Sequence, residues 1–131
     1  MRTVHVAGNP LVPEDSLPLR LLPRLKKAFP AIDFQELDPS EELPRELTLI
    51  DTVQGASGVR VLTELERIVS AKPVGLHDFD LGLTLKLLKK AGRLDSVIII
   101  CVPMTMTEEA AFAGVCAALQ SLARRVSASG P

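Results

Sequence analysis

The chain contains no tryptophan or tyrosine, four phenylalanines and two cysteines among its 131 residues. With so few aromatic side chains, a surface that stacks nucleic-acid bases or sugars is not expected. Fifteen basic residues against sixteen acidic ones leave the chain close to neutral, so it also lacks the excess of positive charge that nucleic-acid binding requires. The composition therefore predicts no nucleic-acid partner.

The two cysteines and the apolar runs predict a compartment. Cys101 and Cys116 lie within apolar segments, and two cysteines are too few for a disulfide framework, so we expect two small core residues in a reducing environment. The longest apolar run, Val97–Val102, is far shorter than the roughly 20 residues of a membrane span. Near the N-terminus, Val4 and Val6 alternate with polar residues as in a strand, not as in a signal peptide. The sequence predicts a cytoplasmic protein without membrane insertion.

Two common signatures of catalysis are also missing. The turn "GNPLVPEDS" after the first strand lacks the second and third glycines of a dinucleotide-binding fingerprint, and its carboxylates would repel a pyrophosphate. No G-x-S-x-G nucleophile elbow occurs. Neither nucleotide binding nor serine-type catalysis is favoured.

Strand-like and helix-like segments alternate along the chain. Nearly half of the residues are apolar, enough for one core in a chain of this length. Strands are predicted at Thr3–Ala7, Ala31–Asp38, Glu46–Asp51, Gly58–Leu62 and Ser96–Pro103, and helices at Leu17–Phe29, Glu64–Val69, Asp80–Ala91 and Met104–Val126. This order predicts an α/β fold of three layers, a mostly parallel twisted sheet with helices on both faces. We expect one domain over residues 1–127 and a flexible C-terminal tail over 128–131.

Polar residues follow several of the predicted strands, at the edge where ligands bind to parallel sheets. Glu14 and Asp15 come after the first strand, Asp51 closes the third, and His77 precedes the helix that begins near Asp80. Two carboxylates and an imidazole from three separate loops form a mixed oxygen and nitrogen set. Such a set suits a borderline divalent ion such as nickel, zinc or manganese, with coordination positions left open.

Each of these residues also has an ordinary structural explanation. Asp15 or Ser16 can cap the first helix, and Asp51 can bind loop amides as in an Asx turn. His77 can be a solvent-facing loop residue. His5, inside the first strand, is expected to be a hydrogen-bonded core histidine and not a ligand.

Taken in order, the segments "GNPLVPED", "LTLIDT", and "HDFDLGLTLKLLKKAG" running into "SVIIICVP" resemble the nickel–iron hydrogenase maturation endopeptidases over about Thr3–Pro103. Matched by motif, the acidic residue of the family's GN turn is Asp15, its strand-ending Asp is Asp51 and its pre-helix His is His77. The resemblance implies that these three residues contact the metal and are catalytic. It implies a protease that removes the C-terminal extension of a nickel-loaded hydrogenase large-subunit precursor. The nickel would then arrive with this partner, and other divalent ions could take its place.

The chain departs from the family pattern at two places. Ser16 and Pro18 stand where the family usually has glycines, and "LDPSEEL", with Asp38, stands where it has a glycine-rich turn. These departures affect the expected recognition of the peptide substrate more than the expected contact with the metal. The alternative reading is a non-catalytic homologue that acts as a hydrogenase-assembly chaperone or scaffold, and a third is a small-ligand α/β module without metal. The sequence predicts neither the oligomeric state nor the particular hydrogenase.

Overall fold

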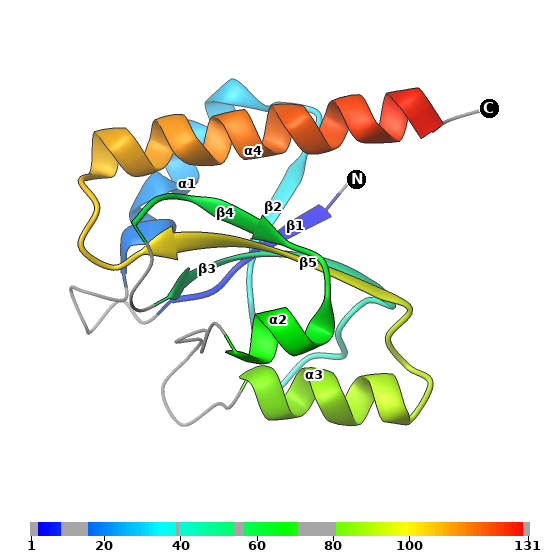
Figure 1. Ribbon diagram of the computed structural model, residues 1–131. Helices are drawn as coiled ribbons and strands as arrows, with labels where there is room; N and C mark the ends of the chain where they lie inside the picture. The colour runs from blue at the N-terminus through cyan, green and yellow to red at the C-terminus, as the bar shows by residue number, and fades with distance from the viewer. Residues whose placement is uncertain (1–2, 9–15, 39, 54–56, 71–80, 130–131) are drawn as a thin grey trace.

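The computed structural model describes residues 3–8, 16–38, 40–53, 57–70 and 81–129 (Figure 1). In chain order the elements are β1 (Thr3–Val6), α1 (Leu17–Ala28), β2 (Asp33–Glu36), β3 (Glu46–Val53), β4 (Arg60–Leu62), α2 (Leu65–Ser70), α3 (Leu81–Lys90), β5 (Ser96–Pro103) and α4 (Glu108–Ser129).

In the described part of the chain, five strands form one sheet in the order β2-β1-β3-β5-β4. β1, β2, β3 and β5 run parallel, whereas β4 pairs with β5 in the antiparallel direction. The connection 54–59 between β3 and β4 is too short for the crossover that a parallel strand would need, so the chain reverses there. The predicted α/β fold with a mostly parallel sheet is confirmed.

The helices cover both faces of this sheet, and the core is therefore divided in two. Because successive strand side chains point to opposite faces, Ile50 and Ile100 pack with α1 and α4, whereas Leu49 and Ile99 pack with α2 and α3. Figure 1 shows α1 and α4 on one side of the strands and α2 and α3 on the other. Burying each such side chain contributes about 1.5–3 kcal/mol. The predicted three layers are present.

α1 follows the predicted apolar period. Its residues Leu17, Leu21 and Leu25 are buried on the side that faces the sheet. Pro18 lies in the first turn, where its missing N–H costs nothing. Ser16 occupies the N-cap position, but its side chain makes no capping hydrogen bond, so the cap expected from the sequence is not formed by this hydroxyl.

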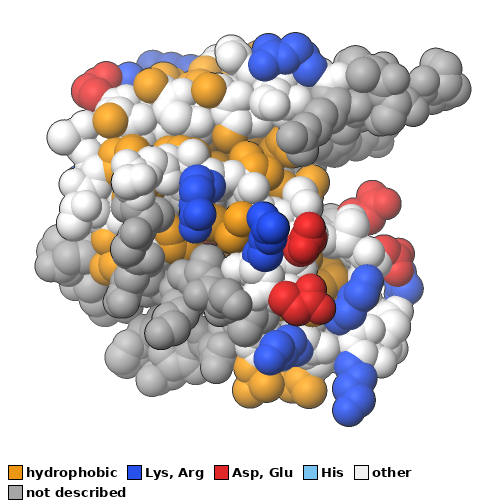
Figure 2. All heavy atoms as spheres, in the orientation of Figure 1, with side chains coloured by type: hydrophobic (Ala, Val, Ile, Leu, Met, Phe, Trp, Pro, Cys, Tyr) orange, Lys and Arg blue, Asp and Glu red, His pale blue; other side chains and the backbone are white. Residues whose placement is uncertain are grey.

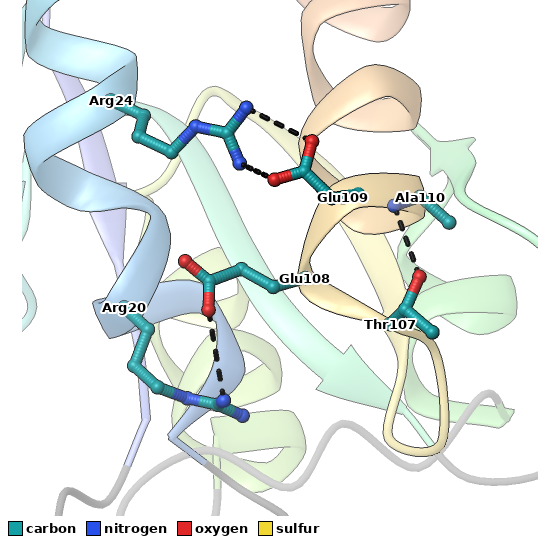
Figure 3. A network of polar contacts seen from close by, with 6 residues as sticks. All are labelled: Arg20, Arg24, Thr107, Glu108, Glu109 and Ala110. Carbon is teal, nitrogen blue, oxygen red and sulfur yellow. Dashed lines mark hydrogen bonds and ion pairs between the residues drawn. The ribbon is translucent and has the colours of Figure 1, made fainter.

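α4 crosses α1, and ion pairs join the two helices on their exposed sides (Figure 3). The Arg24 guanidinium donates to both carboxylate oxygens of Glu109, at 2.8 and 3.2 Å, and lies 4.0 Å from the centre of the Phe112 ring. Arg20 Nη1 is 3.9 Å from Glu108 Oε2. Exposed pairs of this kind contribute about 0–1 kcal/mol each, so they fix the pairing of the helices more than they stabilise the fold.

Thr107 caps α4: its Oγ1 accepts a hydrogen bond from the Ala110 amide at 3.2 Å. The helix runs to Ser129, past the predicted end at Val126 and into the segment 128–131 that was predicted as a flexible tail. Residues 130 and 131 lie outside the described residues. None of the helices in the described ranges is long and apolar enough to cross a membrane.

The C-terminus of α3 is fixed by Gly92. Gly92 has φ of 72°, and the Arg93 amide donates to the Leu88 carbonyl at 2.9 Å, which closes the helix in a left-handed turn. The Arg45 guanidinium then donates to the Gly92 carbonyl at 2.7 Å and to both oxygens of Asp95, at 3.0 and 3.1 Å. These contacts join the residues just before β3 and β5, the two strands that pair along their whole length.

Candidate functional site

The strand order creates a switch point between β1 and β3. From β1 the chain crosses over α1 to β2 on one side, and it then returns to β3 on the other side of β1. In parallel α/β sheets, ligands bind at the carboxyl ends of the strands where the connections diverge in this way. Asp51 lies on β3 next to this position, and the segment that contains Asp15 follows β1. The topology therefore favours the edge at which the sequence predicted a site.

Asp51 lies inside β3, two residues before its end. The sequence led us to expect that Asp51 closes the strand, but β3 continues to Val53 because it stays paired with β5 as far as Pro103. The Asp51 side chain has no exposed surface. Its Oδ1 accepts a hydrogen bond from the Thr52 amide at 2.8 Å, within the strand. The structural explanation of Asp51 was that it binds nearby loop amides, as in an Asx turn. The contact with the Thr52 amide is of this general kind, but it lies in a strand and not in a loop turn.

Asp51 shares its face of the sheet with two residues on neighbouring strands. Cys101 of β5 is the register partner of Asp51, and Arg60 of β4 is the register partner of Cys101. Directly paired residues point to the same face, which is the face covered by α2 and α3. The row therefore places a carboxylate, a thiol and a guanidinium side by side across three strands.

The thiol in this row is protonated at neutral pH. Burial raises the pKa of Cys101 to about 11, the Arg60 charge lowers it, and the Asp51 charge raises it further. A thiol with such a pKa is a poor nucleophile at neutral pH, because little of it is present as thiolate. The prediction that Cys101 is a small core residue agrees with this environment, and both Cys101 and Cys116 are free thiols.

The other predicted site residues, Asp15 and His77, lie outside the described residues, as does Glu14. Among the side chains that the structure describes, no three His, Cys, Asp or Glu residues are grouped to hold a metal ion. Asp51 is thus the one member of the predicted set whose position is established. Its buried carboxylate fits the oxygen donor that the set requires at this edge.

Asp38 and His5 have local roles in the structure. Asp38 follows β2, and its Oδ1 accepts hydrogen bonds from the Ser40 amide and hydroxyl, at 2.9 and 2.7 Å, which lower the pKa of this exposed carboxyl. His5 is half-buried on β1, and its Nδ1 is buried with no hydrogen-bond partner among the described residues. The hydrogen bond that the sequence suggested for His5 is therefore not made by this nitrogen.

Comparisons with models of protein families, with curated proteins and with solved structures find no match.

Any function assigned to the carboxyl edge of the sheet is therefore inferred from the chain's own residues. Sequence reasoning did not single out Arg60, because nothing in the segment "GVRVL" shows that it pairs with "SVIIICVP". The short connection 54–59 is the feature of the sequence that could have indicated this pairing. Because it is short, the chain returns beside the central strands, and Arg60 comes to the edge where Asp51 lies.

Proposed function

We propose that the chain is a cytoplasmic endopeptidase that removes the C-terminal extension of a nickel-loaded hydrogenase large-subunit precursor. In this proposal Asp15, Asp51 and His77 contact the nickel of the substrate and are the catalytic residues. The proposal is supported by the order of the sequence motifs and by one structural observation. That observation is a fully buried carboxylate, Asp51, in the central strand beside the switch point of the sheet.

The burial of Asp51 supports a ligand role for a physical reason. A carboxylate removed from water costs several kcal/mol unless hydrogen bonds or a cation compensate it. The neighbouring positions of β3, Ile50 and Val53 among them, hold apolar side chains or threonine, so Asp51 is a carboxylate in an otherwise uncharged stretch of the strand. A metal-binding carboxylate needs to be held in one orientation, and the Thr52 amide orients Oδ1.

A processing assay with isosteric variants tests the proposal. Purified protein is incubated with a nickel-loaded large-subunit precursor, and loss of the C-terminal extension is followed by mass spectrometry. We expect Asp51→Asn, Asp15→Asn and His77→Gln each to slow processing by at least about tenfold, as loss of a group that holds or orients a metal does. Asp33→Asn is the matched control, because Asp33 is an exposed carboxylate on β2, and we expect it to process normally.

The alternative function, a chaperone or scaffold for hydrogenase assembly, is favoured by one observation. Pro18 is buried in the first turn of α1, where the family usually has a glycine, so the backbone at this position is stiffer than in the family pattern. Stoichiometric binding of the precursor by the wild-type protein without any cleavage would support the scaffold and contradict the endopeptidase. Cleavage that persists in Asp51→Asn would contradict the assigned role of Asp51.

A further inference from the structure

The outward side of α3 carries two exposed leucines, Leu83 and Leu87, with 53% and 58% of their surface exposed. Among the described residues these are the large apolar side chains that remain exposed, and they lie one helical turn apart. With Lys86 and Lys90 they occupy positions i, i+3, i+4 and i+7 of the helix, which fall on one side. We call these four residues the α3 stripe.

The two lysines of the α3 stripe have no carboxylate within ion-pair distance among the described side chains, whose ion pairs lie elsewhere. Lys86 and Lys90 are four residues apart, so their charges repel each other along the helix. Figure 2 shows hydrophobic side chains at the surface of α3, in the lower part of the view, with Lys and Arg side chains beside them. The stripe therefore presents apolar surface and positive charge together.

We propose that the α3 stripe binds an acidic amphipathic helix of a partner protein, with leucine-like side chains packed on Leu83 and Leu87 and carboxylates paired with Lys86 and Lys90. A second copy of this chain fits less well, because a two-fold contact through the stripe would bring the lysines of both copies together. A membrane surface also fits less well. Membrane binding by a surface helix scales with the apolar area that it buries, and two leucines on a ten-residue helix offer little.

Two acidic side chains near α3, Glu41 and Glu42, lie beside a different part of the helix. Glu41 and Glu42 line a separate cavity of about 440 Å³, whose wall on the helix side is formed by Thr84 and Leu88. Thr84 and Leu88 form the next column around the helix, so they separate these glutamates from the stripe. The acidic partner is thus directed to the stripe and not to the cavity. This inference does not depend on the proposed metal site.

The test uses two synthetic amphipathic peptides as probes. Both carry leucines at helical spacing, and one has glutamates and the other lysines at the positions between them. The full chain, labelled with ¹⁵N, is titrated with each peptide, and the shifts of backbone amide resonances are followed by NMR. We expect the glutamate peptide to bind saturably, to move resonances within residues 83–90, and to bind more weakly at high salt. The lysine peptide is expected not to bind.

Paired variants decide whether the stripe is responsible. We expect Leu83→Gln with Leu87→Gln, and separately Lys86→Glu with Lys90→Glu, each to weaken binding of the glutamate peptide by about tenfold or more. Lys26→Glu with Lys27→Glu is the control, because it makes the same charge change at exposed positions of α1, and binding should change little. All six positions are exposed, and thermal melts confirm that the variants fold.

Three outcomes would overturn the proposal. The first is equal binding of the two peptides, or binding that neither pair of stripe variants weakens. The second is concentration-dependent self-association that Leu83→Gln with Leu87→Gln abolishes, which would assign the stripe to a second copy. The third is binding to anionic lipid vesicles, lost in the stripe variants, without binding to the glutamate peptide.

Discussion

At the scale of single residues, Asp51 on β3 and His5 on β1 are two ionisable side chains that the sheet removes from water, the first wholly and the second in part. Asp51 is fully buried, and its Oδ1 is oriented by the Thr52 amide. His5 is half-buried, with a buried Nδ1 that has no partner in the described residues. The proposed function gives Asp51 a role, whereas His5 affects the protein through its protonation.

The stability of the fold should depend on pH through His5. Burial lowers the pKa of His5 below its ordinary value of 6.5, although the charges of Asp33 and Glu41 act in the opposite direction. Because the unfolded chain then binds a proton more readily than the folded one, the contribution of His5 is fully present above about pH 6.5 and decreases as the pH falls through the folded pKa. Protonation would also place a hydrogen on the buried Nδ1, which has no hydrogen-bond acceptor among the described residues.

The variant His5→Gln isolates this contribution, because glutamine does not titrate. The free energy of unfolding of both proteins is measured with urea at about pH 7.5 and about pH 5.5. We expect the wild-type protein to lose more stability than His5→Gln on acidification. An equal loss in the two proteins would show that His5 does not titrate differently in the folded state.

At the scale of elements, α4 approaches the start of β4 so closely that only glycine fits at the contact. A Cβ on Gly114 would lie 2.5 Å from Cγ2 and 2.9 Å from Cβ of Val59. Glycine within a helix costs about 1 kcal/mol relative to alanine, so its presence here is explained by the packing of α4 and not by the helix itself. This contact places the segment before β4, and with it Arg60, against the rest of the fold.

Substitution of Gly114 should therefore have opposite effects in two backgrounds. Gly114→Ala is expected to lower the free energy of unfolding in the wild-type chain, because overpacking costs about 1–3 kcal/mol and exceeds the gain in helix propensity. In a Val59→Gly background, where both of the Val59 atoms that the added Cβ would meet are removed, the same change is expected to raise it by up to about 1 kcal/mol. Urea unfolding of the four proteins measures both effects, and the same change in both backgrounds would contradict the contact.

Most elements could be predicted from the sequence, because their apolar periods reflect burial on one or both faces. The end of β3 and the end of α4 were placed too early. Asp51 interrupts an apolar run, but pairing with β5 carries the strand on to Val53, and Ser127–Ser129 continue α4 with residues that a helix tolerates. The antiparallel direction of β4 depends on the short connection 54–59, a tertiary constraint that periodicity does not show.

At the scale of the whole molecule, the topology explains why a site is expected at one edge. The switch point between β1 and β3 lies where the segment with Asp15 leaves the sheet and where Asp51 is buried. The sequence could predict this edge, because strand and helix alternate and because polar residues follow the strands. It could not predict that Asp51 would be fully buried, since burial depends on how distant elements pack.

The central claim is that Asp15, Asp51 and His77 share one metal ion, and anomalous diffraction from crystals soaked with nickel tests it most directly. We predict one anomalous peak that lies about 2.0–2.2 Å from a carboxylate oxygen of Asp15, a carboxylate oxygen of Asp51 and a ring nitrogen of His77. The account would be contradicted if the three side chains lined different pockets, or if the peak lay on a different set of residues.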